Sequence, residues 1–78
     1  MEKKYHVMLD VRNQDSPIPM IRTKETLDLL TSGDVLKVVT NRESAVKNIK
    51  TMLSNSSAYL LIELTKEAED NTFYIQKP

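Results

Sequence analysis

Ser16 is the side chain with the clearest chemical potential, because it opens the sequence Ser16-Pro17-Ile18-Pro19 just ahead of an apolar segment. A serine hydroxyl acts as a nucleophile only when a general base lies within hydrogen-bond reach. The chain has one histidine, His6, and on an extended strand it lies about 16 Å back from the end that leads to Ser16. A Ser-His pair is therefore not expected. One histidine and no cysteine also give no set of metal ligands, so no metal or cofactor is predicted.

The segments on either side of Ser16 have the hydrophobic patterns of regular structure. Apolar and other residues alternate over 5–11, which predicts a strand with one strongly apolar face. The prolines at 17 and 19 suit the first turn of a helix, because proline fixes φ near the helical value and needs no N–H there. Apolar residues at helical spacing follow, so we expect a helix from about 17 to 31, with Asp15 or Ser16 as its N-cap.

The rest of the chain continues the alternation of strands and helices. The only glycine, Gly33, follows the first helix, where a left-handed residue is most needed. Residues 35–40 are β-branched and few are charged, which predicts a buried strand. Asn41 is the expected N-cap of a second helix with an apolar stripe that ends near Leu53. Two further strands are predicted, over 58–65 and 72–77, joined by a polar acidic loop over 66–71.

These elements predict a β-α-β-α-β-β chain order. Strand-helix-strand units cross over with a right hand, and a chain of 78 residues fills only one sheet and one helical layer. The expected fold class is α/β (α+β): a two-layer sandwich in which two helices cover one face of a four-stranded mixed sheet. We expect a single domain over 1–78.

Composition excludes several functional classes. Eleven basic residues balance eleven acidic ones, so the chain lacks the general charge of a nucleic-acid or anionic-membrane binder. No apolar run, including the one that contains Leu60-Leu61-Ile62, is long enough for a membrane span or a secretory signal. The absence of cysteine excludes disulfides and thiol chemistry. We therefore expect a soluble cytoplasmic protein, with a monomer as the default state.

The motifs around Ser16 resemble those of the TusA/SirA/YedF family of small sulfur-carrier proteins. The resemblance covers nearly the whole chain and rests on Leu9-Asp10-Val11-Arg12, Ser16-Pro17-x-Pro19, Ile21-Arg22-Thr23-Lys24 and Gly33-Asp34-Val35-Leu36. The family motif is Cys-Pro-x-Pro, and its cysteine carries a persulfide from a desulfurase to an acceptor protein. The resemblance implies the same two-layer fold and places Ser16 at the catalytic position.

Serine at this position removes the chemistry of the family. A cysteine at a helix N-terminus has a lowered pKa and an exposed thiolate. A hydroxyl is far less acidic and cannot hold and release a sulfane sulfur by thiol exchange. Other positions also depart from the family pattern: Asn13 replaces a common glycine, Asn41-Arg42-Glu43 replaces Asp-Asp-Pro, and Asn48-Ile49-Lys50 replaces Asp-Ile-Pro.

The resemblance also implies a partner-binding surface beside Ser16. In the family, the basic residue at the position of Lys24 and the apolar residues beside the cysteine help to dock the sulfur donor or acceptor. Arg12, Arg22 and Lys24 are each also explained as charged surface side chains in contact with solvent. Met20 is equally explained as a residue of the hydrophobic core. The candidate partner-binding residues are Arg12, Asp15, Pro17, Pro19, Met20, Ile21, Arg22 and Lys24.

Three functional hypotheses follow. The first is a family member without sulfur transfer, which acts by protein docking or regulation in sulfur or selenium metabolism, with a cysteine desulfurase or a sulfur-acceptor protein as partner. The second is a true sulfurtransferase in which a native cysteine has been replaced by Ser16. The third is RNA binding by a domain of similar fold, against which the zero net charge and four aromatic residues argue.

Overall fold

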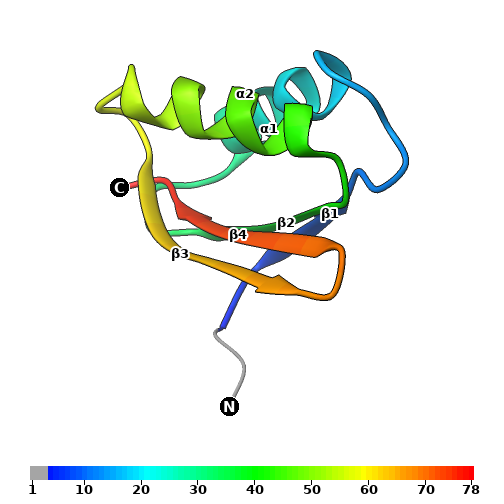
Figure 1. Ribbon diagram of the computed structural model, residues 1–78. Coiled ribbons are helices and arrows are strands. Elements are labelled where there is room, and N and C mark those ends of the chain that lie inside the picture. The colour runs from blue at the N-terminus through cyan, green and yellow to red at the C-terminus, as the bar shows by residue number, and fades with distance from the viewer. Residues whose placement is uncertain (1–3) are drawn as a thin grey trace.

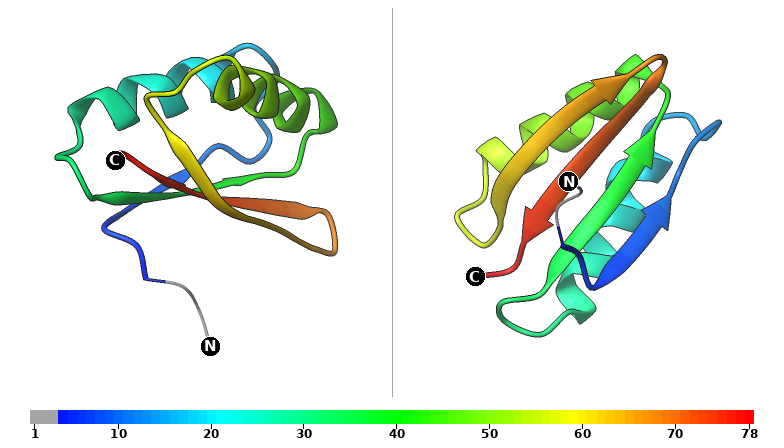
Figure 2. Two further views of the ribbon diagram at one scale, coloured as in Figure 1. Left: turned by 90° about the vertical axis from the view of Figure 1, so that its left-hand side faces the viewer. Right: turned by 90° about the horizontal axis from the view of Figure 1, so that it is seen from below.

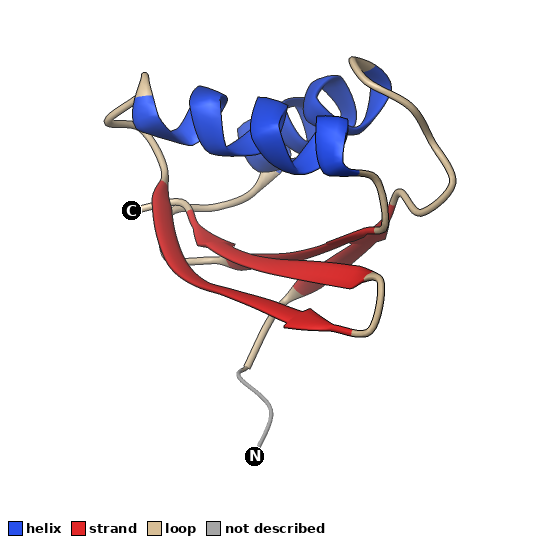
Figure 3. Cartoon of the chain, viewed as in Figure 1, coloured by secondary structure: helices blue, strands red, loops and turns tan. Residues whose placement is uncertain are grey.

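A four-stranded sheet with two helices on one face makes up the fold (Figure 1). The structure, a computed structural model, describes residues 4–78. The chain order is β-α-β-α-β-β, which confirms the predicted fold class. The elements are β1 (Val7–Asp10), α1 (Ile18–Leu29), β2 (Val35–Thr40), α2 (Glu43–Ser54), β3 (Leu60–Glu67) and β4 (Asp70–Gln76). Figure 3 shows the helices as one layer and the strands as the other.

The strand order in the sheet is β1-β2-β4-β3. β1 and β2 are parallel and are joined through α1, whereas β4 runs antiparallel to both β2 and β3. Seen from the open side of the sheet, α1 lies behind β1 and β2, and α2 lies behind β4 and β3 (Figure 2). The sheet is therefore mixed, as predicted, with one face covered by helices.

The core lies between the sheet and the helices. Leu9, Val38 and Phe73 are cross-strand neighbours in one row, and all three are buried. α2 contributes Val46, Ile49 and Leu53, which recur at helical spacing and form an apolar stripe. The contribution of α1 is less apolar, since its buried positions are Pro19, Thr23 and Leu27.

Thr23 is a polar residue in this core, and it is fully buried. Its hydroxyl donates a 2.7 Å hydrogen bond to the carbonyl oxygen of Pro19, one helical turn back. This bond satisfies the hydroxyl inside the protein, which is the condition for burying a polar side chain at low cost.

The connection between β3 and β4 differs from the prediction. Instead of a loop over 66–71, the strands continue to Glu67 and resume at Asp70, with a two-residue turn at Ala68 and Glu69. Ala68 has a φ of 55°, the positive sense that matches a tight hairpin turn to the strand twist. The prediction was wrong because Lys66 and Glu67 lie on a paired strand while exposed to solvent, and Asn71 lies on a paired strand while buried, so polarity did not mark a loop.

Both predicted helix caps are also wrong. α1 has Pro17 at its N-cap position and α2 has Arg42, and neither helix start has a side-chain capping bond. The side chains of Ser16 and Asn41 instead bond to residues of other segments, as described below. Gly33 has the predicted positive φ of 95°, but α1 ends earlier, so this glycine lies in the turn that leads to β2 rather than at the helix cap.

Candidate functional site

Ser16 lies in the connection between β1 and α1, at the end of the molecule where both helices begin (Figure 1). Its side chain is half-buried, and its Oγ accepts a hydrogen bond from Nδ2 of Asn48, in the second turn of α2. The peptide bond between Ser16 and Pro17 is cis. The hydroxyl is thus positioned by the neighbouring helix rather than by the start of its own.

The backbone at the start of α1 explains this arrangement. Positions 17 and 19 are prolines, so two of the N–H groups that a helix start normally presents do not exist. The N–H of Ile18 is donated to the carbonyl of Asp15 at 3.1 Å. Few backbone donors therefore remain beside Ser16, and Asn48 supplies the donor from α2.

A second amide pair joins the loops that follow β1 and β2. The N–H of Asn13 donates to Oδ1 of Asn41 at 2.8 Å, and Nδ2 of Asn41 donates to Oδ1 of Asn13 at 2.9 Å. Asn13 has a φ of 64°, a left-handed conformation that asparagine adopts more readily than most residues. The pair holds the Asn13 loop, which leads to Ser16, against the start of the α2 segment.

Side chains beside Ser16 form a mixed apolar and charged surface at the start of α1. Ile18 is 52% exposed and Ile21 is 45% exposed, which is unusual for isoleucine on a helix that packs against a core. Arg22 bonds to Gln14 at 3.4 Å, and Asp15 forms an ion pair with Arg42 at 3.3 Å. We call Ile18, Ile21 and Arg22 the α1 surface.

Four of the eight predicted partner-binding residues lie around Ser16, and four do not. Asp15, Pro17, Ile21 and Arg22 lie at or near the surface around Ser16, together with Ile18, which the sequence did not single out. Pro19 is fully buried, and Met20 is partly buried against the core. These two residues shape the helix start from inside, so they are not part of a docking surface.

Lys24 belongs to a separate cluster further along α1. Its Nζ lies 3.2 Å from Oδ2 of Asp28, and the hydroxyl of Tyr59 donates to Oδ1 of the same carboxylate. These two bonds, that of Tyr59 above all, lower the pKa of Asp28 below its usual value. The bond to Asp28, helped by partial burial, raises the pKa of Tyr59 above its usual value. Lys24 is therefore engaged within the protein, although its side chain is still 58% exposed.

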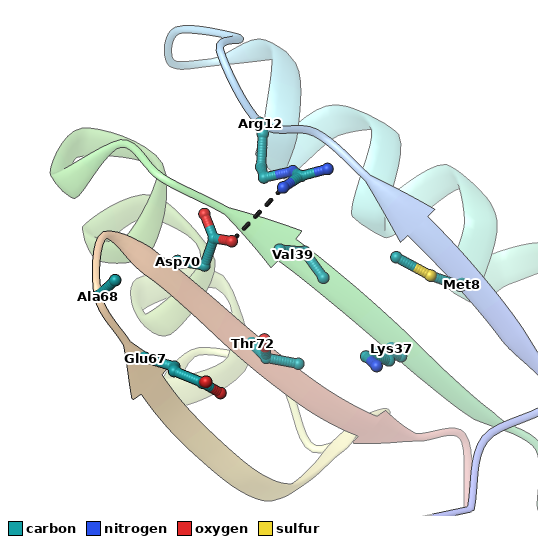
Figure 4. Close-up of a pocket in the computed structure, with 8 residues that line it drawn as sticks. All are labelled: Met8, Arg12, Lys37, Val39, Glu67, Ala68, Asp70 and Thr72. Atoms are coloured by element: carbon teal, nitrogen blue, oxygen red, sulfur yellow. Dashed lines mark hydrogen bonds and ion pairs between the residues drawn. The ribbon is translucent and has the colours of Figure 1, made fainter. Parts of the chain in front are cut away.

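Arg12 lies on the opposite face of the sheet from the helices. Its guanidinium pairs with Asp10 at 2.9 Å and with Asp70 at 3.5 Å. The hydrogen bonds from Arg12 lower the pKa of Asp10. Figure 4 shows Arg12 at the rim of a shallow hollow of about 440 Å³ on the open face of the sheet. Arg12 is therefore not part of the α1 surface.

This hollow is the second candidate site, and charged side chains at its rim already pair with one another. It is lined by Met8, Arg12, Lys37, Val39, Glu67, Ala68, Asp70 and Thr72. Lys37 lies 5.0 Å from the ring centre of Tyr5 and 5.9 Å from that of Tyr74, a cation-π arrangement. The hollow is therefore a surface ion-pair network rather than a closed ligand cavity.

His6 lies far from Ser16, as expected from the sequence. It precedes β1, and its Nδ1 accepts a 2.9 Å hydrogen bond from the N–H of Val35. Among residues 4–78 there is no cluster of three or more His, Cys, Asp or Glu side chains able to hold a metal ion. Neither helix in that range has the length and apolar character needed to cross a membrane.

The sequence predicted where the site lies but not the side chains that form hydrogen bonds there. Asn13 and Asn48 stand out only as departures from the family pattern, and Asn41 also as the expected N-cap of the second helix. Nothing in their spacing shows that Asn48 bonds to Ser16. These contacts depend on how the two loops and the two helices pack against one another. A polar residue on the second turn of α2, one turn beyond the apolar Ala45, was the only available signal.

The β-α-β-α-β-β order, with two helices on one face of a mixed four-stranded sheet, defines a small two-layer α+β domain. A family model described as "Sulfurtransferase TusA" matches residues 7–77. The chain therefore belongs to the TusA family, and it is a member without cysteine.

Similar proteins agree with this assignment. YrkI of Bacillus subtilis, named as a candidate sulfur carrier protein, is 37% identical over 70 residues, which is 90% of this chain and 92% of the relative. A candidate sulfur carrier protein of Methanocaldococcus jannaschii is 36% identical over 61 residues, 78% of this chain and 79% of the relative. The crystal structure of a SirA-like protein from Desulfitobacterium hafniense superposes with a TM-score of 0.76 at 26% identity, and the match covers 91% of this chain and 96% of that one.

Proposed function

We propose that this protein is a docking or regulatory member of the TusA family in sulfur or selenium metabolism, acting in the cytoplasm. It binds the proteins that exchange sulfur with carriers of this family, a cysteine desulfurase or a sulfur acceptor, and takes no sulfur itself. The observation that carries the proposal is that the α1 surface is exposed beside a position where oxygen replaces sulfur.

The site around Ser16 supports a native serine over an engineered one. Three of the residues that depart from the family pattern, Asn13, Asn41 and Asn48, form hydrogen bonds in this region. Asn48 bonds directly to Ser16. A single replacement of a cysteine would leave the surrounding pattern unchanged, whereas here the neighbours differ along with it. The alternative of a sulfurtransferase with a replaced cysteine is tested by the codon for residue 16 in the source gene.

A competition experiment tests the docking role. A cysteine-bearing carrier of the family receives labelled sulfur from a cysteine desulfurase or passes it to an acceptor, and this protein is added in excess. We expect a slower transfer in at least one of these two reactions, because the α1 surface occupies the carrier's docking site without removing sulfur. Intact mass of this protein after the reaction should show no added sulfur atom.

Matched variants locate the contact. Ile21→Glu places a charge on the α1 surface, and we expect it to remove the inhibition. Leu29→Glu is the control, since Leu29 lies at the other end of α1 and is 87% exposed. Unchanged rates in both reactions with the parent protein would contradict the docking role, as would equal inhibition by the parent and Ile21→Glu.

A further inference from the structure

The side chain of Ser16 ends in a single oxygen atom that is bonded to the neighbouring helix. The side chain is half-buried, and its Oγ accepts a hydrogen bond from Nδ2 of Asn48 on α2. Pro17 and Ile18, which follow it, are exposed. A partner that docks on the α1 surface therefore meets a short, neutral side chain at position 16, which Asn48 holds toward α2.

The carriers of the family that have a cysteine present two states to their partners. In the unloaded state the side chain ends at the thiol sulfur Sγ, one atom beyond Cβ, as serine ends at Oγ. In the loaded state a second sulfur lies about 2 Å beyond Sγ, and it can ionise as a thiol does. Ser16 has no atom at the place of this second sulfur. In length, the serine therefore resembles the unloaded state and not the loaded one.

The two kinds of partner use different states of a carrier. A cysteine desulfurase passes the terminal sulfur of its own persulfide to the thiolate of an unloaded carrier. The S–S bond of the desulfurase breaks, an S–S bond forms on the carrier, and the desulfurase cysteine leaves as a thiolate. An acceptor takes the terminal sulfur from a loaded carrier and then releases the unloaded one. Because each partner must release its product, we expect its affinity to favour the state that it uses.

We propose that this protein occupies the carrier-binding site of the cysteine desulfurase as a mimic of the unloaded carrier, and that it does not compete at the sulfur acceptor. The inference rests on the docking role proposed above and selects one of its two partners. The desulfurase contacts the α1 surface and a side chain of the unloaded length, but the Ser16 hydroxyl cannot take its sulfur. The acceptor contacts the same surface without the terminal sulfur of its substrate.

The residues around Ser16 support this choice. A mimic of the loaded carrier would need a longer or an anionic side chain at position 16, such as aspartate, and this chain has a serine there. Within residues 4–78, the one side chain bonded to Ser16 is the neutral amide of Asn48. Arg42, a cation of this region, is paired with Asp15 at 3.3 Å. The end of the Ser16 side chain is therefore uncharged, as is an unionised thiol.

Separate measurements of loading and unloading test the proposal. In the loading reaction, a desulfurase transfers labelled sulfur from cysteine to a cysteine-bearing carrier of the family. In the unloading reaction, the same carrier, already loaded and freed of desulfurase, passes the label to an acceptor protein. Calorimetry first gives the Kd of this protein for the desulfurase. At about five times that Kd we expect loading to slow at least about fivefold, because most carrier-binding sites are then occupied. The rate of unloading should not change.

A matched pair of variants tests the mimicry itself. Ser16→Asp gives position 16 the added length and the negative charge of the loaded state. We expect it to raise the Kd for the desulfurase at least about tenfold, because a charge without a partner is costly in an interface. Leu29→Asp adds the same charge at the other end of α1 and should leave the Kd and the inhibition of loading unchanged. Circular dichroism checks that both variants are folded.

The outcomes separate this inference from the docking role. If the parent protein slows neither reaction, the docking role fails and the inference fails with it. If it slows unloading as much as loading, or unloading alone, the choice of the desulfurase is overturned and the docking role stands. Equal Kd values of the parent and a folded Ser16→Asp would overturn the mimicry of the unloaded state.

Discussion

Asn48 on α2 donates a hydrogen bond from Nδ2 to Oγ of Ser16, at the start of α1. The bond crosses between the two helices and points a donor at the atom where the family carries its reactive sulfur. An amide N–H at that place stabilises negative charge, and a carboxylate would oppose it. Position 48 therefore offers Ser16 a neutral hydrogen-bond donor, where the family pattern has an aspartate.

The first prediction is that Ser16→Cys creates a reactive thiol. The Nδ2 donor of Asn48 should lower the pKa of the new thiol below the usual value of about 8.5. Adding Asn48→Asp should raise that pKa by about one unit, since a carboxylate repels the thiolate. The measurement is the rate of alkylation by iodoacetamide as a function of pH. Leu29→Cys, at an exposed position, provides the reference, and a Ser16→Cys titration identical to it would contradict the prediction.

The second prediction concerns the paired asparagines of the loops after β1 and β2. Asn13→Ala removes one side of the Asn13–Asn41 pair and places alanine at a positive φ. We expect a loss of about 1–2 kcal/mol in the free energy of unfolding, from the hydrogen bond and the backbone strain together.

Two further variants separate these causes in urea unfolding. Asn13→Gly loses the same side-chain acceptor without the strain, so its loss should be smaller than that of Asn13→Ala. Asn41→Ala removes both hydrogen bonds of the pair, because the Asn41 side chain accepts one and donates the other, and it leaves the residue at position 13 unchanged. Equal stability of Asn13→Ala and the parent would show that the pair does not stabilise the folded protein.

The sequence predicted the elements well where the pattern depended on burial. The strand over 35–40 is observed with the same bounds, because both neighbours of β2 are strands and its side chains are mostly buried. Local polarity was a poorer guide. It predicted a loop where β3 and β4 pair to their ends, and caps where Ser16 and Asn41 bond to distant residues instead.

The candidate site shows the same division. The position of Ser16 and the helix that follows it were predictable, because prolines and helical spacing are local signals. Its contact with Asn48 joins residues that are 32 positions apart, and only the packing of α1 on α2 brings them together. The exposure of Ile18 and Ile21 was hidden for the same reason, since the pattern of α1 does not show which apolar residues face solvent.

The third prediction tests the buried hydroxyl of Thr23. Thr23→Val keeps the shape of the side chain but removes the donor to the carbonyl of Pro19. We expect a loss of about 0.5–1.5 kcal/mol in the free energy of unfolding. Thr26→Val is the matched control, because Thr26 makes the same 2.7 Å bond to the carbonyl of Arg22 at an exposed position. An equal loss in the free energy of unfolding for both variants would show that burial does not increase the contribution of the Thr23 hydrogen bond.

The last prediction concerns pH and the bond between Tyr59 and Asp28. The folded-state pKa of Tyr59 is raised, so its contribution to stability is complete below the unfolded-state pKa near 10 and is lost as the pH rises through the folded-state pKa. The folded-state pKa of Asp28 is lowered, so its contribution is complete above the unfolded-state pKa near 4 and is lost as the pH falls through the folded-state value. Tyr59→Phe removes the bond, so the parent should be more stable than the variant at neutral pH. That difference should shrink both in strong alkali and in strong acid. Urea unfolding of the two proteins from acid to alkaline pH measures it, and a difference that stays constant across the whole range would show that the Tyr59 hydroxyl and the Asp28 carboxylate are not coupled.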